Sequence, residues 1–430
     1  MPTINIPELQ AKRQALLFPN HTPYYDAPLM LTKARGTRVW DSEGREYLDA
    51  FGGVVSISLG HNHPAIKARL RSMLDADMIQ HTTHLYFHPY LEELAAKLLA
   101  LTPGPLERAY FSNSGSEANE LALLAARLAS GEEMIISLRH SYHGGTNATL
   151  NLCGNYRWKF AHQPSGGTTH AVAPYCYRCP YGASPTSCNL ECADDVKRVI
   201  ETTTAGKIAG VIVETILGVG GVIDPPLEYH RRVYAHCKQY GGKYIADEVQ
   251  SGIGRTGKHF FAIEESGVIP DMITSAKGLG NGAPIGALLS DVASAEALRG
   301  KLHFNTFAGD PYQSMQATVV VEEAGTPLHL AHVAARGAEL KAGLEELAEE
   351  FPQIGEVRGR GLMLGLELVK DRDSKEPAAE ECERLLNRCK EELLLVGRGG
   401  LYGNVLRLAP PLCITKTEVA ELLTKLKQAL

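Results

Sequence analysis

The sequence has no surplus of basic residues and no long apolar run. Its 43 lysines and arginines are outnumbered by 49 aspartates and glutamates, so the formal net charge is −6. No cationic excess is left to neutralise nucleic-acid phosphates. No apolar run approaches the roughly 20 residues that a membrane-spanning helix needs. We therefore expect no nucleic-acid partner and no membrane-spanning segment.

The N-terminal residues lack the basic start and apolar core of a secretory or transit segment. The sequence also has no internal repeat and no low-complexity tract. Its 9 cysteines are an odd number spread over a long chain, which favours reduced thiols over a disulfide framework. These features predict a cytoplasmic protein.

Glycine is the residue type that the sequence has in excess. The 42 glycines in 430 residues exceed the average share of roughly 7%. They gather in four stretches, which are FSNSGSEAN, GVGGV, SGIGRTG and KGLGNGAPIG. Glycine allows a backbone or a ligand to come close, so these stretches indicate candidate sites.

Strand and helix patterns alternate along the middle of the chain. Helical patterns such as 116–129 and 227–240 lie between segments with strand patterns, which are 108–113, 133–138, 209–216 and 243–249. This alternation favours crossover connections and a parallel sheet covered on both faces. We therefore predict an α/β fold.

The length of the chain allows two or three domains. We predict a large domain at 61–315 and a smaller α/β domain at 316–430, in which 357–369 is predicted as one strand. The N-terminal segment 1–60 mixes turns with short strands, and we expect it to join the small domain.

The stretch FSNSGSEANE predicts a phosphate site. A strand ends there and a helix begins near Ser116, so free N–H groups and the helix dipole favour an anion. Gly115 would let a phosphate approach the backbone, and Ser114 and Ser116 would add hydroxyl donors. An ordinary helix N-cap is the alternative interpretation.

Lys277 follows the short apolar segment PDMIT and is followed by three glycines. Asp247, which lies 30 residues earlier, ends another apolar segment. Neighbouring parallel strands would bring both residues to one edge of the sheet, where α/β proteins bind ligands. A desolvated lysine has a lowered pKa and becomes a nucleophile towards carbonyl groups.

A nucleophilic lysine, a carboxylate and a phosphate cradle are the set that pyridoxal 5'-phosphate requires. Lys277 would form the Schiff base, and Asp247 would keep the pyridine nitrogen protonated, so that the ring serves as an electron sink. Tyr142, in SYHGG, could stack on the ring, and Thr306, in HFNTFAGDP, could reach a phosphate. Each of these two also fits an ordinary loop.

The stretch GIGRTG at 252–257 matches the dinucleotide motif G-x-G-x-x-G, so an NAD-binding oxidoreductase is an alternative. The residues around this motif fit a dinucleotide-binding site poorly. Residues 247–251 separate the strand from the first glycine, and no acidic residue ends a second strand about 20 residues further on.

Four cysteines, Cys176, Cys179, Cys188 and Cys192, follow the spacing C-x₂-C-x₈-C-x₃-C. Four thiolates could hold a structural zinc ion, whereas free thiols in a surface loop would give the same pattern. We assign no metal to the site. A non-catalytic, zinc-bearing interaction protein would have no use for the lysine and aspartate.

The motifs resemble those of the class III aminotransferases of fold type I over nearly the whole chain. SGSEANE, SYHGG, VIVETILGVGG, IADEVQSGIGRTG, PDMITSAKGLGNG, NTFAGDP and NVLRLAPPLCIT occur in family order. Within the family, they are most similar to the mitochondrial-type alanine–glyoxylate subgroup. The resemblance implies a mostly parallel seven-stranded sheet, a small domain from both terminal segments, and a homodimer, possibly a tetramer, with active sites at the interface.

The resemblance also implies roles for single residues around the cofactor. Lys277 would hold pyridoxal phosphate and move the proton, and Asp247 would pair with the ring nitrogen. Gln250 would contact the ring hydroxyl. Gly115 and Ser116 would bind the phosphate.

Four further residues have implied roles at the ring, the partner subunit and the substrate. Tyr142 would stack on the ring, and Thr306 would reach the phosphate in the neighbouring subunit. Arg407 would bind the substrate carboxylate, and Glu214 could pair with Arg407 or move aside. VETILG replaces the commoner VEPIQG near the expected substrate pocket, which leaves the amino donor open.

The sequence thus predicts a transaminase with a ping-pong mechanism. An amino group from alanine, or from a β- or ω-amino acid, would pass to a 2-oxo acid such as glyoxylate or pyruvate. A phospho-lyase acting on an amino-alcohol phosphate is the alternative within the same family.

Overall fold

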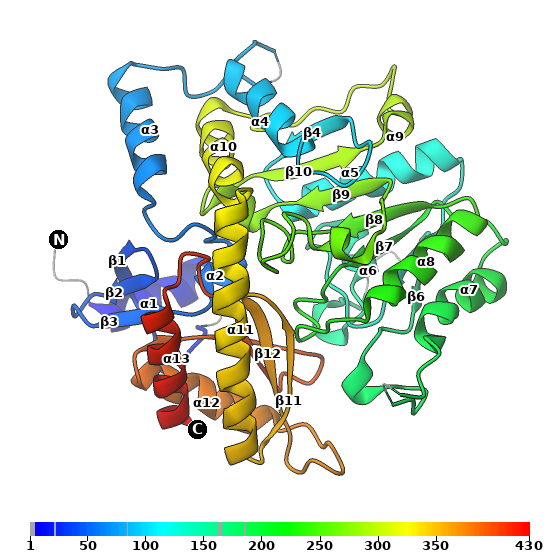
Figure 1. Ribbon diagram of the computed structural model, residues 1–430. Coiled ribbons are helices and arrows are strands. Elements are labelled where there is room, and N and C mark those ends of the chain that lie inside the picture. Colours follow the sequence, from blue (N-terminus) through cyan, green and yellow to red (C-terminus); the bar gives the residue numbers. More distant parts are fainter. Residues whose placement is uncertain (1–4, 21–22, 84, 162–165, 185) are drawn as a thin grey trace.

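The computed structural model describes residues 5–20, 23–83, 85–161, 166–184 and 186–430. Its centre is a seven-stranded sheet in the order β4-β10-β9-β8-β7-β5-β6 (Figure 1). The strands are β4 (Arg108–Ser112), β5 (Ile135–Leu138), β6 (Thr168–Ala171), β7 (Gly210–Glu214), β8 (Lys243–Asp247), β9 (Met272–Ser275) and β10 (Gly286–Ser290). The neighbours from β9 to β6 are parallel, and β10 is antiparallel to both β9 and β4. The predicted α/β fold with a mostly parallel seven-stranded sheet is confirmed.

Helices cover both faces of this sheet. Because successive side chains of a strand point to opposite faces, Ile212 and Ile245 pack towards one layer of helices while Val211 and Tyr244 pack towards the other. The first layer contains α5 (Gly115–Ser130), and the second contains α4 (Pro89–Leu99), α7 (Glu191–Thr203), α8 (Leu227–Gln239) and α10 (Pro311–Ala324). Burial on both faces explains the near-continuous apolar runs of the central strands.

The smaller part of the molecule contains two four-stranded sheets. One consists of β1 (Leu31–Arg35), β2 (Arg38–Asp41), β3 (Glu46–Asp49) and β13 (Leu394–Leu395), and the other of β11 (Ile354–Arg360), β12 (Met363–Leu368), β15 (Val405–Leu408) and β14 (Gly397–Gly399). Three helices accompany them, α11 (Pro327–Glu350), α12 (Ala379–Glu391) and α13 (Lys416–Ala429). Because β3 pairs with β13, the N- and C-terminal segments build this part together.

The predicted single strand at 357–369 is wrong, because a tight turn divides this segment into β11 and β12. Gly361 has φ +55°, which favours glycine, and a Cβ atom there would lie 2.5 Å from the carbonyl oxygen of Arg255. The domain limits stay a prediction. The limit at 315 falls inside α10, whose buried residues belong to the core of the large part.

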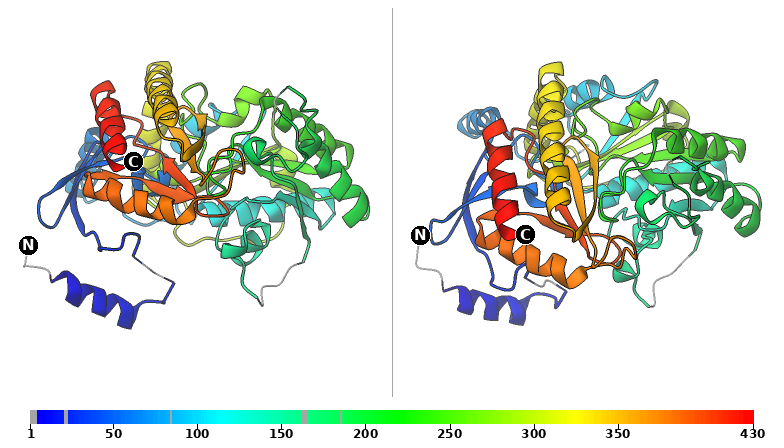
Figure 2. Two further views of the ribbon diagram at one scale, coloured as in Figure 1. Left: turned by 90° about the horizontal axis from the view of Figure 1, so that it is seen from below. Right: turned by 60° about the horizontal axis from the view of Figure 1, so that its bottom comes forward.

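The N-terminal helix α1 (Ile6–Leu16) has no buried residue and lies on the outside of the molecule (Figure 2). The remaining helices are short except α3, and they are α2 (Gly52–Val55), α3 (Pro64–Asp75), α6 (Asn147–Leu152), α9 (Val292–Glu296) and the 3₁₀ turns at Tyr156–Trp158, Cys176–Arg178, Ala262–Ser266 and Lys277–Gly280. Within the described ranges, no helix has the length and apolarity to cross a membrane.

Candidate active site

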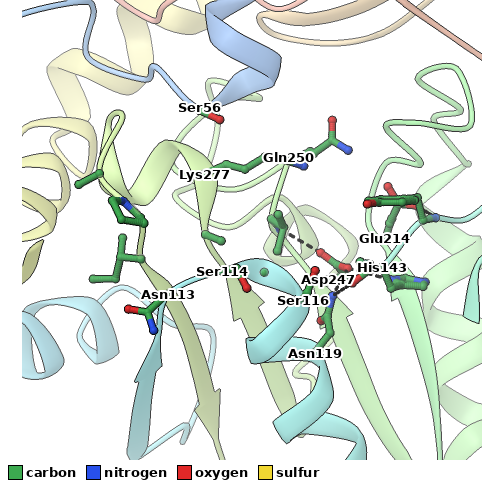
Figure 3. A pocket seen from close by; sticks show the side chains of 18 of the residues that line it. Ser56, Asn113, Ser114, Ser116, Asn119, His143, Glu214, Asp247, Gln250 and Lys277 are labelled. Carbon is green, nitrogen blue, oxygen red and sulfur yellow. Dashed lines mark hydrogen bonds and ion pairs between the residues drawn. The ribbon is translucent and has the colours of Figure 1, made fainter. Parts of the chain in front are cut away.

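A cavity of about 410 Å³ lies at the carboxyl ends of the central strands (Figure 3). Strand register explains why its acidic residues meet, since Glu214 of β7 is paired with Asp247 of β8, and Asp247 with Thr274 of β9. Eight of the residues predicted from the sequence line the cavity, namely Ser114, Gly115, Ser116, Tyr142, Glu214, Asp247, Gln250 and Lys277.

Asp247 is buried and held by three N–H donors. Its Oδ2 accepts hydrogen bonds from His143 Nδ1 at 2.7 Å and Asn119 Nδ2 at 2.9 Å, and its Oδ1 accepts one from the Val249 amide at 3.1 Å. These bonds fix the direction of the carboxylate. A fixed carboxylate at the floor of a cavity suits a protonated pyridine nitrogen.

Sequence reasoning did not identify His143 and Asn119. His143 directly follows Tyr142, and Asn119 lies one helical turn beyond Gly115, so neither has a pattern of its own. Thr274 Oγ1 donates to Asn119 Oδ1 at 2.7 Å, which turns the amide nitrogen of Asn119 towards Asp247. His143, Asn119 and Thr274 come from separate segments of the chain, and only the folded sheet brings them to Asp247.

The N-terminus of α5 forms a close-packed cradle. The Ser114 hydroxyl caps the helix by accepting from the Glu117 amide at 3.2 Å. Ser116 Oγ accepts from the Gly145 amide at 3.1 Å. A Cβ atom on Gly144 would lie 2.5 Å from Ser116 Oγ, so only glycine leaves this space open. The cradle fits a phosphate group, because a helix N-terminus offers free N–H donors to an anion.

Lys277 starts the 3₁₀ turn after β9, with φ +46°, and its side chain lines the same cavity. Burial lowers the pKa of Lys277 from 10.5 to about 8, the nearby guanidinium of Arg407 acts in the same direction, and the carboxylates of Asp247 and Glu214 partly oppose both. The amine is therefore neutral and nucleophilic in about one tenth of the molecules at pH 7, far more than an ordinary lysine.

The lowered pKa of Lys277 predicts enhanced reactivity in the enzyme stripped of cofactor. Compared with an amine of pKa 10.5, one of pKa about 8 has a neutral fraction larger by about 10^2.5, or roughly 300-fold, at pH 7. Acetic anhydride labelling followed by peptide mass spectrometry should show a midpoint near pH 8 for Lys277. The exposed Lys301 serves as the internal reference, and a Lys277 midpoint above pH 10 would contradict the prediction.

Glu214 lines the cavity, whereas Arg407 lies behind the lining residue Gln250, and the two are not paired with each other, although the structure describes both. Glu214 Oε1 accepts from the Tyr142 amide at 2.9 Å and Oε2 from the Gly218 amide at 2.8 Å. Burial raises the pKa of Glu214 to about 7, and the neighbouring Asp247 carboxylate adds to this. Arg407 donates instead to Gln250, and burial lowers its pKa.

Two predicted residues differ in their relation to the cavity. Tyr142 lines it, and its ring packs on Trp158 with centroids 4.7 Å apart. Thr306 is exposed and does not line it. The adjacent Asn305 does reach the rim, where its Oδ1 accepts from Asn113 Nδ2 at 2.8 Å. The proposed contact of Thr306 with a neighbouring subunit stays a prediction.

The four cysteines of the C-x₂-C-x₈-C-x₃-C pattern, Cys176, Cys179, Cys188 and Cys192, line a separate cavity of about 520 Å³. All nine cysteines of the chain are free thiols in the structure. Among the described residues, no three histidine, cysteine, aspartate or glutamate side chains are placed to hold a metal ion. The structural-zinc alternative stays an untested hypothesis.

Comparisons with known proteins agree with this arrangement. The family model "Aminotransferase class-III" matches residues 21–430. An alanine–glyoxylate aminotransferase 2 homolog of Arabidopsis thaliana is 38% identical over 408 residues, covering 95% of this chain and 84% of that protein. A leucine/methionine racemase of Thermococcus litoralis is 36% identical over 424 residues, covering 97% and 94%.

Solved structures show the same fold. An amine transaminase from an uncultivated Pseudomonas species, solved in its PLP-bound form, has a TM-score of 0.88 and 30% identity, and the match covers 96% of this chain and 97% of that one. The cavity described above has the cradle, carboxylate and lysine that such a cofactor needs.

Proposed function

Because this chain belongs to the class III aminotransferase family and is a pyridoxal-phosphate-dependent transaminase, we propose that its amino donor is an α-amino acid, with alanine as the first candidate. The acceptor we propose is a small 2-oxo acid such as glyoxylate or pyruvate. The name of the Arabidopsis relative supports this pair.

The observation that carries the choice of donor is the buried guanidinium of Arg407. It is 4% exposed and lies on β15, between β12 and β14, so its backbone is held on both sides. Its Nε has no partner among the described residues. A planar guanidinium pairs best with a planar carboxylate, through charge-assisted and directional hydrogen bonds.

The residues around the cavity have separate roles in the proposed reaction. Bound pyridoxal phosphate supplies an electron sink for negative charge that develops at the donor Cα. Lys277 Nζ holds the cofactor and moves the proton of the donor Cα, for which a pKa of about 8 is well matched to neutral pH. Asp247 is the fixed anion that opposes the ring nitrogen, and Arg407 orients the donor.

A stoichiometric assay tests the proposal. The purified holoenzyme with L-alanine and glyoxylate should form pyruvate and glycine in equal amounts. Release of inorganic phosphate from phosphoethanolamine without need of a 2-oxo acid would instead identify a phospho-lyase. Formation of D-alanine without an acceptor would identify a racemase. Either activity in the absence of amino transfer would overturn the proposal.

Substitution of Arg407 tests the donor directly. Arg407→Lys keeps the charge but loses the planar fork. We expect kcat/KM for L-alanine to fall by about 10- to 100-fold, or ~1.4–2.8 kcal/mol. Isopropylamine, in which a methyl group replaces the carboxylate of alanine, should lose much less.

The matched control for this substitution is Arg398→Lys on the neighbouring strand β14, where Arg398 pairs with Glu383 at 3.0 Å. This variant should leave both donors nearly unchanged. Equal losses for both donors in Arg407→Lys would show that Arg407 supports the fold or the cofactor instead of the substrate.

We also propose that the enzyme is a homodimer in which Thr306 completes the partner's phosphate site. The exposed apolar side chains of Leu302, Phe304 and Phe307 around Thr306 support this assembly. Analytical ultracentrifugation should show a dimer, and Thr306→Val should weaken binding of pyridoxal phosphate. A stable, fully active monomer would contradict it. The cytoplasmic location stays a prediction.

A further inference from the structure

The nitrogens of the Arg407 guanidinium differ in their hydrogen bonding. Its Nη2 donates to Gln250 Oε1 at 2.5 Å, and its central carbon lies 5.2 Å from the centroid of the Phe51 ring. Its Nε is buried and has no partner among the residues that the structure describes. A buried N–H without an acceptor costs free energy, so an acceptor from outside the chain that reached this atom would remove that cost.

The partner of Arg407 is neutral, although two buried carboxylates lie near the same cavity. Glu214 is engaged by the amides of Tyr142 and Gly218, and Asp247 by His143, Asn119 and a backbone amide. Gln250 thus orients the guanidinium without cancelling its charge. That charge stays available to an incoming anion.

Gln250 is itself held in place by close backbone packing. A Cβ atom on Gly218 would lie 2.5 Å from both Cδ and Oε1 of Gln250 and 2.6 Å from its Nε2, so the amide lies against the bare backbone of Gly218. Because a guanidinium can only donate, the amide oxygen must be the atom that faces Arg407. Gln250 is 6% exposed, which limits other orientations.

We propose that Gln250 is the positioning residue of Arg407: it holds Nη2 with a neutral acceptor, so that the guanidinium keeps its charge and its unpaired Nε–H for the carboxylate of the amino donor. This inference rests on the proposed function, in which the donor is an α-amino acid. It assigns the choice of carboxylate donors to a pair of residues, Gln250 and Arg407, backed by Gly218.

Gln250→Glu tests the neutrality of the acceptor, since the side chain keeps its size and gains a charge that would pair with Arg407. Propionate, a carboxylate without an amino group, serves as the probe in calorimetric titrations of both holoenzyme and apoenzyme. We expect propionate binding to weaken by at least about tenfold. The exposed Gln239→Glu is the matched control and should bind propionate like the wild type.

Turnover provides a second readout. In Gln250→Glu, the ratio of kcat/KM for L-alanine to kcat/KM for isopropylamine should fall by about tenfold or more, mainly through KM for L-alanine, because a change at the cofactor would affect both donors alike. Gly218→Ala should act in the same direction with Gln250 intact, because the new Cβ displaces its amide. Thermal unfolding and cofactor content would establish that each variant is folded.

The outcomes separate this inference from the proposed function. Unchanged propionate affinity in Gln250→Glu, or equal losses for alanine and isopropylamine, would overturn the role of Gln250. A wild-type enzyme that transfers no amino group from alanine but binds propionate through this pair would overturn the proposed donor and leave the inference standing. Gln250→Met, which removes the acceptor without adding charge, should weaken propionate binding as well.

Discussion

Lys277→Ala should reduce transamination by about 10⁴-fold or more, because it removes both the covalent attachment of the cofactor and the base that moves the donor proton. The methyl side chain introduced at position 277 has no nitrogen that could take either role. The neighbouring carboxylates of Asp247 and Glu214 cannot form a Schiff base, and hydrogen bonds from protein N–H groups fix their positions. Steady-state turnover with alanine and glyoxylate measures the loss.

The cradle at the N-terminus of α5 is intact in this variant, so pyridoxal phosphate should still bind, but dialysis should remove it. Borohydride reduction of the wild type followed by peptide mass spectrometry should place the cofactor on the peptide that contains Lys277, and Lys277→Ala should carry none. Lys301→Ala, at an exposed position, is the control. Cofactor found on another lysine would refute the assignment.

The strand ends were the predictable part of the site. Asp247 and Lys277 each follow an apolar run, and parallel strands of one sheet must end at the same edge, so their approach follows from the pattern alone. The cradle was predictable for a similar reason, because a strand, a glycine turn and a helix start are all contained in FSNSGSEANE. In each case a short stretch of sequence identifies the residues, and the order of strands in the sheet brings them together.

The contacts that could not be predicted are long-range ones between polar side chains. Asn119 and Asp247 are separated by 128 positions, and Arg407 and Gln250 by 157. No local pattern encodes which amide a buried guanidinium will meet. The resemblance to the family suggested that Glu214 could pair with Arg407 or move aside, and in this structure the amides of Tyr142 and Gly218 hold Glu214 instead.

The hairpin of β11 and β12 shows a second reason why sequence patterns did not predict the whole structure. The apolar residues of 357–369 continue through the turn, so periodicity alone joined the two strands. The turn depends on Gly361, which packs against the backbone of Arg255 in the large part of the molecule. Packing between distant segments thus sets the turn between β11 and β12, and the residues of 357–369 alone do not reveal that packing.

Asp247→Asn should lower kcat by about a thousandfold, or ~4 kcal/mol, although the side chain keeps its size. The first reason is the lost charge, since a neutral amide cannot keep the ring nitrogen of the cofactor protonated. The second is the set of donors around the carboxylate. His143 and Asn119 donate to Oδ2 and the Val249 amide donates to Oδ1, so an asparagine NH₂ group must face at least one donor in either orientation.

Asn119→Ala separates these two causes. It removes one donor but keeps the carboxylate of Asp247, which His143 and the Val249 amide still hold. We expect a loss of about tenfold or less, corresponding to one hydrogen bond to a charged group at ~1.5 kcal/mol. Single-turnover reaction with L-alanine, followed by the absorbance of the bound cofactor, compares the variants at equal cofactor occupancy. Losses of similar size in Asp247→Asn and Asn119→Ala would mean that Asp247 only supports the local packing, and that the charge of its carboxylate does not contribute to the reaction.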